Sequence, residues 1–356
     1  MRFGPLFCAM MLLPATAAAA QQLPPEPATP SMVMYPSDLP PPEWLQPYLV
    51  NGMPDPNNIG WMRGLFDDAN PADKANWKTL KAWGDRCWAA GHAAALAELK
   101  AMGEAAPELE KQKLTSAAPL CKAIDFAKPE PSIRKDWNAY RVANDEAGRV
   151  FSIFMAGAEA GQGSFMIDPK WATEDGFDLL TAPRREQVLR KAFSFEHKSK
   201  VKLDPMVSHA LNRRLSLALV EEDHKNTTML KRWVAEKGWP TITAMGEKPS
   251  HAAWLMVQHA DNDPAFQLQA LRLMEPLVAK GEVDKKNFAY LYDRVKLKTK
   301  GQQRYGTQVT CEAGKRINLP LEDTQKLDGL RQDIGLEPVK DYIATMDKNF
   351  PPCPTG

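Results

Sequence analysis

The chain has few cysteines, no long apolar run and none of the common hydrolase signatures. Only 5 of its 356 residues are cysteine. No window comes near the roughly 20 uninterrupted apolar residues that a membrane-spanning helix needs. The sequence contains no H-E-x-x-H zinc motif, no G-x-S-x-G nucleophile motif and no glycine-rich phosphate loop. These absences argue against a membrane-embedded protein and exclude the hydrolase classes that those motifs define.

Net charge is also small. The chain contains 45 Lys and Arg residues against 44 Asp and Glu residues. A basic surface large enough to attract a nucleic acid over a long range is therefore not expected. No motif in the sequence indicates a cofactor, so we expect neither a nucleic-acid partner nor a cofactor.

The N-terminus has the pattern of an export signal. Within residues 1–20, Arg2 precedes an apolar run over 6–13, and small residues fill 16–20. This order is typical of a cleaved signal peptide, and the run is about half as long as a membrane-spanning helix. We expect a periplasmic or secreted protein that is not inserted in a membrane after cleavage. Residues 21–59 contain eleven prolines, which predicts an extended leader whose second half can lie along the folded body.

Cysteine number and export together favour disulfides. Without Cys8, four cysteines remain, and an even count in an exported chain is typical of disulfide pairing. Pairing neighbours along the chain gives Cys87–Cys121 and Cys311–Cys353, each worth about 3–4 kcal/mol in the chain-entropy model. Three pairings are compatible with the sequence. A zinc site would need closely spaced ligands, which these cysteines do not provide.

From residue 60 onward the sequence has helical patterning. Asn70-Pro71 and Asp204-Pro205 each place a capping side chain before a proline at the first helical position, and Gly238 supplies a stop. We expect an all-α fold in two packed helical parts, an N-terminal region over 60–200 and a C-terminal domain over 201–356. The expected helices cover 71–102, 107–127, 136–160, 183–195, 205–237, 250–260 and 264–280, one that begins at 285, and two within 321–346.

One β-hairpin is expected, near 304–319. Residues 307–310 are rich in β-branched side chains, and Glu312-Ala313-Gly314 is a turn sequence. We expect this hairpin to be the only sheet in the protein.

The helix expected from residue 183 carries a run of basic residues. Arg190 belongs to this run, and Glu186 interrupts it. A mixed run of this kind is typical of a solvated helix face, so no anionic partner is inferred from it.

Four polar and aromatic clusters recur between the helical segments of the C-terminal half. Together they resemble a bacterial domain family of unknown function over about residues 223–346. The resemblance implies an all-helical domain and supplies no activity and no catalytic roles. The clusters are Gly238-Trp239-Pro240, Gln258-His259-Ala260-Asp261, Ala289-Tyr290-Leu291 with Asp293-Arg294-Val295, and Tyr305-Gly306-Thr307-Gln308.

These clusters suggest one candidate site. His259 is suited to act as a general acid or base, oriented by the carboxylate of Asp293 or Asp223. Asp223 and Asn226 lie on the apolar stripe of the helix expected over 205–237, so their polar groups must be satisfied by each other, by the backbone or by something bound. The side chains expected to bind a substrate are Arg294, Tyr305, Gln308, Asn226 and Gln258.

A structural interpretation of the same residues is equally concrete. A buried hydrogen-bond network of His259, Asp293, Arg294 and Tyr305 could tie the hairpin to three helices. Under either interpretation, we expect these four residues and Asp223 to converge in space.

The sequence H-x-D-x-D at 259–263 contains possible metal ligands. Residues at i, i+2 and i+4 do not share one face of a helix, and Asp263 is also in position to cap the next helix. We therefore expect no metal site here.

Two functions remain compatible with the sequence. The first is a binding or interaction module of the bacterial cell envelope with a protein or glycan ligand. The alternative is an acid–base hydrolase that acts on a polar envelope substrate at a site around His259. An enzyme needs His259 and one carboxylate to be accessible, whereas a binding module can keep them buried.

Overall fold

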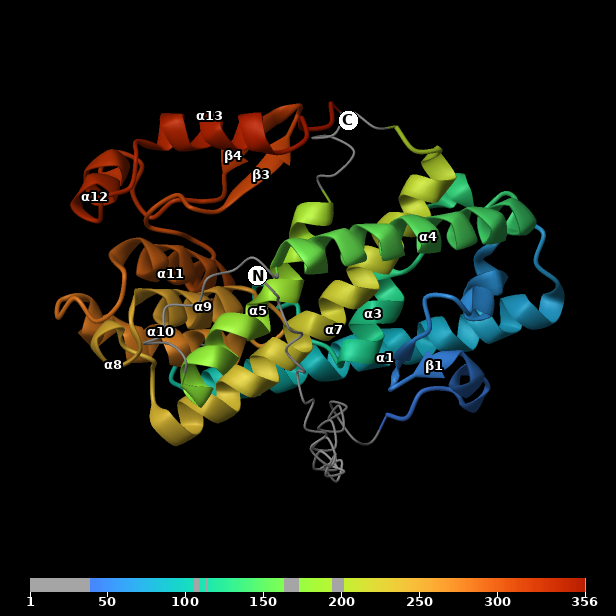
Figure 1. The fold of residues 1–356 in the computed structure, drawn as a ribbon, viewed down its shortest axis with the longest axis horizontal. Coiled ribbons are helices and arrows are strands. Elements are labelled where there is room, and N and C mark those ends of the chain that lie inside the picture. Colours follow the sequence, from blue (N-terminus) through green and yellow to red (C-terminus); the bar gives the residue numbers. More distant parts are fainter. Residues whose placement is uncertain (1–38, 106–108, 113, 163–172, 194–201, 356) are drawn as a thin grey trace, which may run out of the picture. The chain divides into compact units, whose positions relative to one another are not determined.

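The structure is a computed structural model that describes residues 39–105, 109–112, 114–162, 173–193 and 202–355 (Figure 1). The described chain is mostly helical, which confirms the predicted all-α fold. The elements before residue 200 are η1 (Glu43–Tyr48), β1 (Leu49–Val50), β2 (Met53–Pro54), η2 (Ile59–Leu65), α1 (Pro71–Ala101), α3 (Pro119–Phe126), η3 (Pro131–Ile133), α4 (Trp137–Gln162) and α5 (Glu174–Ala192). Those after it are α7 (Pro205–Lys237), α8 (Ile242–Met245), α9 (Glu247–Gln258), α10 (Pro264–Val278), α11 (Lys285–Lys300), β3 (Val309–Glu312), β4 (Lys315–Asn318), α12 (Leu327–Asp333) and α13 (Val339–Asn349).

Helix α7 begins and ends where the sequence predicts. The Asp204 carboxylate accepts a hydrogen bond of 2.8 Å from the backbone N–H of Met206, and Pro205 occupies the first position. At the other end Gly238 has a φ of 78°, a left-handed conformation that suits glycine. Because both signals are local in sequence, they could be recognised without knowledge of the tertiary structure.

Helix α7 packs against α3, α4, α5 and α9, so it connects the helices that precede residue 200 with those that follow it (Figure 1). Its predicted apolar stripe is buried at Leu211, Leu215, Leu230 and Val234. Each such side chain contributes about 1.5–3 kcal/mol on burial. The stripe therefore fixes the position of the polar residues that lie between its leucines. The predicted boundary at 200/201 lies outside the described residues.

The prediction of one continuous helix over 107–127 is wrong, because residues 114–118 are not helical and α3 begins only at Pro119. Residues 114–118 run without helical structure toward the turn after α9. There Ser116 Oγ donates to the carbonyl of Asn262 at 3.2 Å, and the Asn262 side chain accepts from the Ala117 N–H at 3.0 Å. These tertiary hydrogen bonds replace the helical ones, and Pro119 starts α3.

The predicted start of α5 is also wrong. The helix begins at Glu174, with the Thr173 hydroxyl accepting from the Gly176 N–H at 3.0 Å, and Pro183 lies inside it. The cap at Thr173, followed by Glu174 and Asp175, is the helix-start signal that outweighs the proline.

Two hairpins are present among the described residues. Strands β3 and β4 pair antiparallel with Val309 opposite Asn318, which confirms the predicted hairpin. Strands β1 and β2 form a second antiparallel pair, so the expectation of a single sheet is wrong. The turn between them is Asn51-Gly52, both with positive φ, a sequence that strongly favours hairpins.

The described part of the leader lies on the folded body, as predicted. The Trp83 indole donates to the carbonyl of Leu39 at 3.0 Å, and the Trp44 indole donates to Thr79 Oγ1 at 3.2 Å. Leu45 is completely buried. The expected signal peptide and residues 21–38 lie outside the described residues.

Both predicted disulfides are present. Cys87–Cys121 joins α1 to α3 with its Cα atoms 6.3 Å apart, and Cys311–Cys353 joins β3 to the segment after α13 at 5.3 Å. Within the described ranges, no helix is both long enough and apolar enough to cross a bilayer.

Candidate functional site

The centre of the candidate site is a contact between His259 and a buried glutamate of α5. His259 follows the last residue of α9, and its Nδ1 lies 2.8 Å from Glu186 Oε1. Glu186 is completely buried, whereas the His259 side chain is 18% exposed. Nδ1 itself is buried and, by hydrogen-bond geometry, has no partner among the described residues, so the 2.8 Å approach to Glu186 is a close contact between a basic and an acidic group. Glu186 therefore lies on the buried Nδ1 side of the ring, and the exposed part of the side chain belongs to its other atoms.

Arg190 connects this pair to a second carboxylate. It lies one turn after Glu186 on α5 and forms an ion pair with it. Its Nη2 also donates to both carboxylate oxygens of Asp223 on α7, at 2.9 and 3.1 Å. Asp223 is 16% exposed. The Arg190 guanidinium thus binds two carboxylates, that of buried Glu186 and that of partly exposed Asp223.

The environment separates the protonation states of these groups. Burial raises the pKa of Asp223 to about 7, although Arg190 opposes this shift. Burial would also raise the pKa of Glu186, but its contacts with His259 and Arg190 outweigh burial and lower it. Burial lowers the pKa of His259, and Arg190 and Arg294 lower it further, so the pKa lies below its ordinary value although Glu186 opposes the shift. At neutral pH, therefore, Glu186 is ionised, His259 is neutral and Asp223 exchanges a proton.

A second ion group adjoins the first. Asp261, in the turn between α9 and α10, accepts from Arg294 Nη1 at 2.6 Å and from Lys298 Nζ at 2.8 Å. Burial would raise the pKa of Asp261, but these two cations lower it well below its ordinary value. The positive charge of Arg294 also acts on His259, and Lys122 of α3 lies close enough to attract both Asp223 and Asp261. The two ion groups therefore form one site.

We call this site the His259 cluster, and it draws residues from four helices, α3, α5, α7 and α11, and from the turn between α9 and α10. Two buried amides lie in its immediate sequence neighbourhood: Asn226, one turn from Asp223 on α7, and Gln258, next to His259. Neither Asn226 Nδ2 nor Gln258 Oε1 has a hydrogen-bond partner in the part of the chain that the structure describes. Buried polar atoms of this kind are normally satisfied by water or a ligand. The members of the cluster are Lys122, Glu186, Arg190, Asp223, His259, Asp261, Arg294 and Lys298.

The carboxylate of Asp293 belongs to a different network. It is completely buried and accepts from the backbone N–H groups of Arg304 at 2.8 Å and of Tyr305 and Thr307 at 2.9 Å. The Thr307 hydroxyl donates to it at 2.9 Å as well. Gln308 continues this network, since its backbone N–H donates to Gln303 Oε1 at 2.9 Å. We call residues 293 and 303–308 the hairpin anchor, because they hold the segment before β3 on α11.

Most residues of the His259 cluster lie in a part of the chain that matches a known family model. Residues 212–351 match a Family of unknown function (DUF6624). This match confirms the resemblance that the sequence clusters suggest over 223–346. No curated protein and no solved structure matches the chain. Asp223, His259 and Arg294 lie within the DUF6624 region, whereas Glu186 and Arg190 precede it.

The structure divides the predicted site residues of the DUF6624 region into two groups. Asp223, His259 and Arg294 meet in the His259 cluster, with Asn226 and Gln258 beside them. Asp293, Tyr305 and Gln308 lie in the hairpin anchor instead. Adjacent residues of an α-helix project about 100° apart, so Asp293 and Arg294 point to different neighbours. The convergence of all these residues in space stays a prediction, although Asp293 and Tyr305 bond to each other in a separate network and the carboxylate beside His259 is Glu186.

Sequence reasoning missed Glu186 and Arg190, the two site residues of α5, and it also did not predict the ionic contacts of Lys122, Asp261 and Lys298. Interpreting their segment as a solvated face is wrong at Glu186, which is buried. A usable signal was present, since Glu186 continues the three-to-four spacing of buried Leu179 and Pro183. A charged residue on a buried stripe needs a partner, and that partner is His259.

The H-x-D-x-D segment uses its carboxylates for other contacts. Asp261 binds Arg294 and Lys298, while Asp263 caps α10 at the Phe266 N–H with a distance of 2.9 Å and forms an ion pair with Lys231. Among the described residues, no group of three or more His, Cys, Asp or Glu side chains is arranged to hold a metal ion.

Proposed function

We propose that the protein is an exported acid–base enzyme that acts on a polar envelope substrate at the His259 cluster. The observation that carries this proposal is the placement of His259 Nδ1 2.8 Å from buried Glu186, beside an Asp223 whose pKa is raised to about 7. A buried carboxylate behind an imidazole fixes its orientation and its tautomer. A second carboxyl that exchanges its proton near neutral pH provides an acid.

The proton transfers follow from these protonation states. Neutral His259 keeps its proton on Nδ1, toward Glu186, so Nε2 has a free lone pair. Nε2 would accept a proton from a water molecule as its oxygen bonds to the electrophilic atom of the substrate. Protonated Asp223 would give its proton to the leaving group as the bond to that group breaks. His259 then returns the proton to Asp223, which restores the starting state.

The charges of the cluster favour a substrate with an anionic group. Four basic side chains, Lys122, Arg190, Arg294 and Lys298, face three carboxyl groups, and burial lowers the pKa of the two lysines. One of the carboxyl groups, Asp223, is protonated part of the time at neutral pH. The excess of positive charge attracts a carboxylate or another anion. The buried amides of Asn226 and Gln258 offer further hydrogen-bonding groups.

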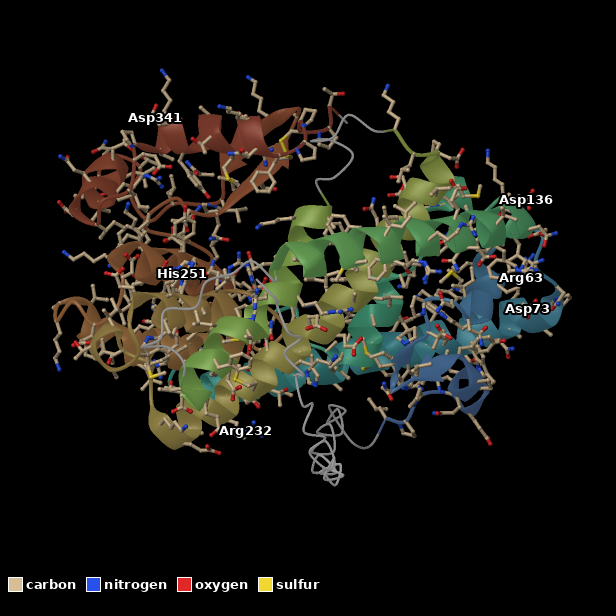
Figure 2. All side chains as sticks on the ribbon, in the orientation of Figure 1. Arg63, Asp73, Asp136, Arg232, His251 and Asp341 are labelled. Carbon is tan, nitrogen blue, oxygen red and sulfur yellow. A yellow bond between two sulfur atoms is a disulfide. The ribbon has the colours of Figure 1, made fainter. Side chains whose placement is uncertain are left out.

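A non-catalytic binding module is the second candidate, and a row of aromatic rings favours it. Ring centroids lie 4.9 Å apart between His251 and Trp254, and 6.3 Å apart both between Trp254 and Tyr290 and between Tyr290 and Tyr342. His251 is exposed and labelled in Figure 2, and Trp254 and Tyr290 are half-buried. Tyr342 at the end of the row is buried, and the partly exposed rings at its other end suit a protein or glycan ligand.

One experiment separates the two candidates. Purified peptidoglycan sacculi are incubated with the wild-type protein and with His259→Ala, Glu186→Gln and Trp254→Ala variants. Protein that sediments with the sacculi measures binding, and soluble fragments detected by mass spectrometry measure cleavage.

Each candidate gives a distinct pattern of results. The enzyme proposal predicts fragments from the wild type and from Trp254→Ala, and none from the other two variants. The binding proposal predicts sedimentation without fragments, lost in Trp254→Ala. If wild-type protein neither sediments nor releases fragments, a peptidoglycan substrate is refuted.

A further inference from the structure

A second charged site lies in the N-terminal half of α7, before the residues that α7 contributes to the His259 cluster. Arg213 and Arg214 are adjacent in sequence, and only 2% and 5% of their surfaces are exposed. They lie against α4 and against the segment that follows β2. Burying a guanidinium is costly unless an opposite charge or a full set of hydrogen bonds compensates it. Two neighbouring buried arginines therefore need an identifiable compensation.

The protein atoms that bind the pair are all neutral. Arg213 Nη2 donates to the carbonyl of Pro56 at 3.0 Å and to Asn144 Oδ1. Arg214 donates through Nη1 to Asn57 Oδ1 at 2.9 Å and through Nη2 to the carbonyl of Asn144 at 3.0 Å. These bonds fasten the segment after β2 to the helices, but they supply no negative charge.

Carboxylates are present only at longer range. Asp55 attracts both guanidinium groups, and Asp145 attracts Arg214. Within the ranges that the structure describes, neither carboxylate forms an ion pair or a hydrogen bond with the two arginines. Burial lowers the pKa of Arg214 to about 10, so its guanidinium stays charged at neutral pH.

Several buried donors around the pair have no acceptor. By hydrogen-bond geometry, Nε and Nη1 of Arg213 and Nε of Arg214 have no acceptor among the described residues, although the Tyr140 hydroxyl oxygen is close enough to Arg213 to interact with it as an acceptor. His209 lies one turn before Arg213, and its Nε2 accepts from the Glu130 N–H at 3.2 Å. Its proton is therefore on Nδ1, which is buried and also has no acceptor in the described chain. The Tyr140 ring lies 6.2 Å from the His209 ring, and its hydroxyl is close enough to act on Arg213.

Neither Tyr140 nor His209 can supply the missing negative charge. Burial raises the pKa of Tyr140, which keeps its hydroxyl protonated at neutral pH. Burial lowers the pKa of His209, which keeps it neutral. Helix α4 approaches Arg214 most closely at Gly148, which has no side chain. A Cβ at this position would lie only 3.0 Å from Arg214 Nη2. Among the residues that the structure describes, the region thus gathers donors and two positive charges without a hydrogen-bonded anionic acceptor.

We propose that Arg213 and Arg214 form a binding site for a small anion with oxygen acceptors, a carboxylate or an inorganic oxyanion. The anion accepts hydrogen bonds from the unpartnered guanidinium nitrogens, and His209 and Tyr140 add donors at its side. It neutralises the buried charges and stabilises the contact between α4, α7 and the segment after β2. The site does not depend on the function proposed for the His259 cluster.

The test is thermal unfolding of the full chain at constant ionic strength, with chloride replaced stepwise by acetate, sulfate or phosphate. A ligand that binds only the folded state raises Tm in a saturable way, here by a few degrees. We expect this rise with at least one of the three anions. It should disappear in Arg213→Gln and Arg214→Gln. Arg232→Gln, an exposed arginine of the same helix that Figure 2 labels, should respond like the wild type.

A milder variant covers the case in which the arginine variants do not fold. Tyr140→Phe keeps the ring and removes one donor, so the anion concentration for half-maximal effect should rise roughly 2- to 10-fold. Equal responses of the wild type and either arginine variant would overturn the proposal. If the arginine variants do not fold, the proposal would be overturned by a Tyr140→Phe variant that needs the same anion concentration as the wild type for half of the maximal rise in Tm. A saturable response to chloride alone, or no saturable response to any anion, would also overturn it.

Discussion

Replacing Asp293 with alanine tests whether this aspartate is a structural residue of the hairpin anchor. The carboxylate accepts four hydrogen bonds from residues 304–307, at distances of 2.8–2.9 Å. It lies at the middle of α11, so the replacement changes no helix cap. Any loss of stability would therefore report on the loop that leads into β3.

The expected loss follows from the donors that the replacement leaves behind. Each buried donor without an acceptor costs about 1–3 kcal/mol. Water can enter the space that the carboxylate leaves and satisfy some of the donors, so the total is smaller than the sum. We expect Asp293→Ala to lower the free energy of unfolding by about 3–5 kcal/mol.

Guanidinium chloride unfolding with both disulfides intact measures this loss. Asp341→Ala is the matched control, because Asp341 is exposed in the first turn of α13 and is labelled in Figure 2. Its replacement should cost less than about 1 kcal/mol. If Asp293→Ala unfolds at the same midpoint as Asp341→Ala, the structural role assigned to Asp293 is refuted.

Two further predictions concern Asp223 and the disulfides. The folded-state pKa of Asp223, about 7, exceeds the ordinary aspartate value of 3.8, so the folded state binds a proton more tightly than the unfolded state. Stability should therefore fall as pH rises from about 4 to about 7, by on the order of 4 kcal/mol from this group, and Tm profiles of Asp223→Asn should lack this fall. Removing the Cys87–Cys121 bridge with a double serine variant should cost about 2–5 kcal/mol. Equal Tm values for the oxidised wild type and the double serine variant would contradict the stabilising role of this disulfide.

Local signals in the sequence explain what could be predicted of the fold. The caps at Asp204 and Asn70 and the stop at Gly238 act on residues only a few positions away, so they fix the helix ends. Residues 114–118 leave the helical pattern because they bond to Asn262, about 145 residues later. No periodicity within the segment can show such a partner.

The same reasoning applies to the candidate site. His259 and Asp223 could be selected because a titratable residue on an apolar stripe needs a partner. The identity of the partner depends on how α5 packs against α7 and α9, and the charge run around Glu186 concealed its burial. Asp293 and Arg294 are adjacent in sequence but belong to different networks, because the helix turns by about 100° per residue.

The most direct test of the central claim is the NMR titration of the His259 side chain. The His259→Ala spectrum identifies its signals among those of the six histidines. Burial beside Arg190 and Arg294 predicts a pKa below the ordinary value of 6.5, even though Glu186 opposes the shift. Glu186→Gln should lower this pKa further, and Asp293→Asn should leave it unchanged. A His259 pKa that does not respond to Glu186→Gln, or that responds to Asp293→Asn instead, would contradict the assignment of Glu186 as the carboxylate of this site.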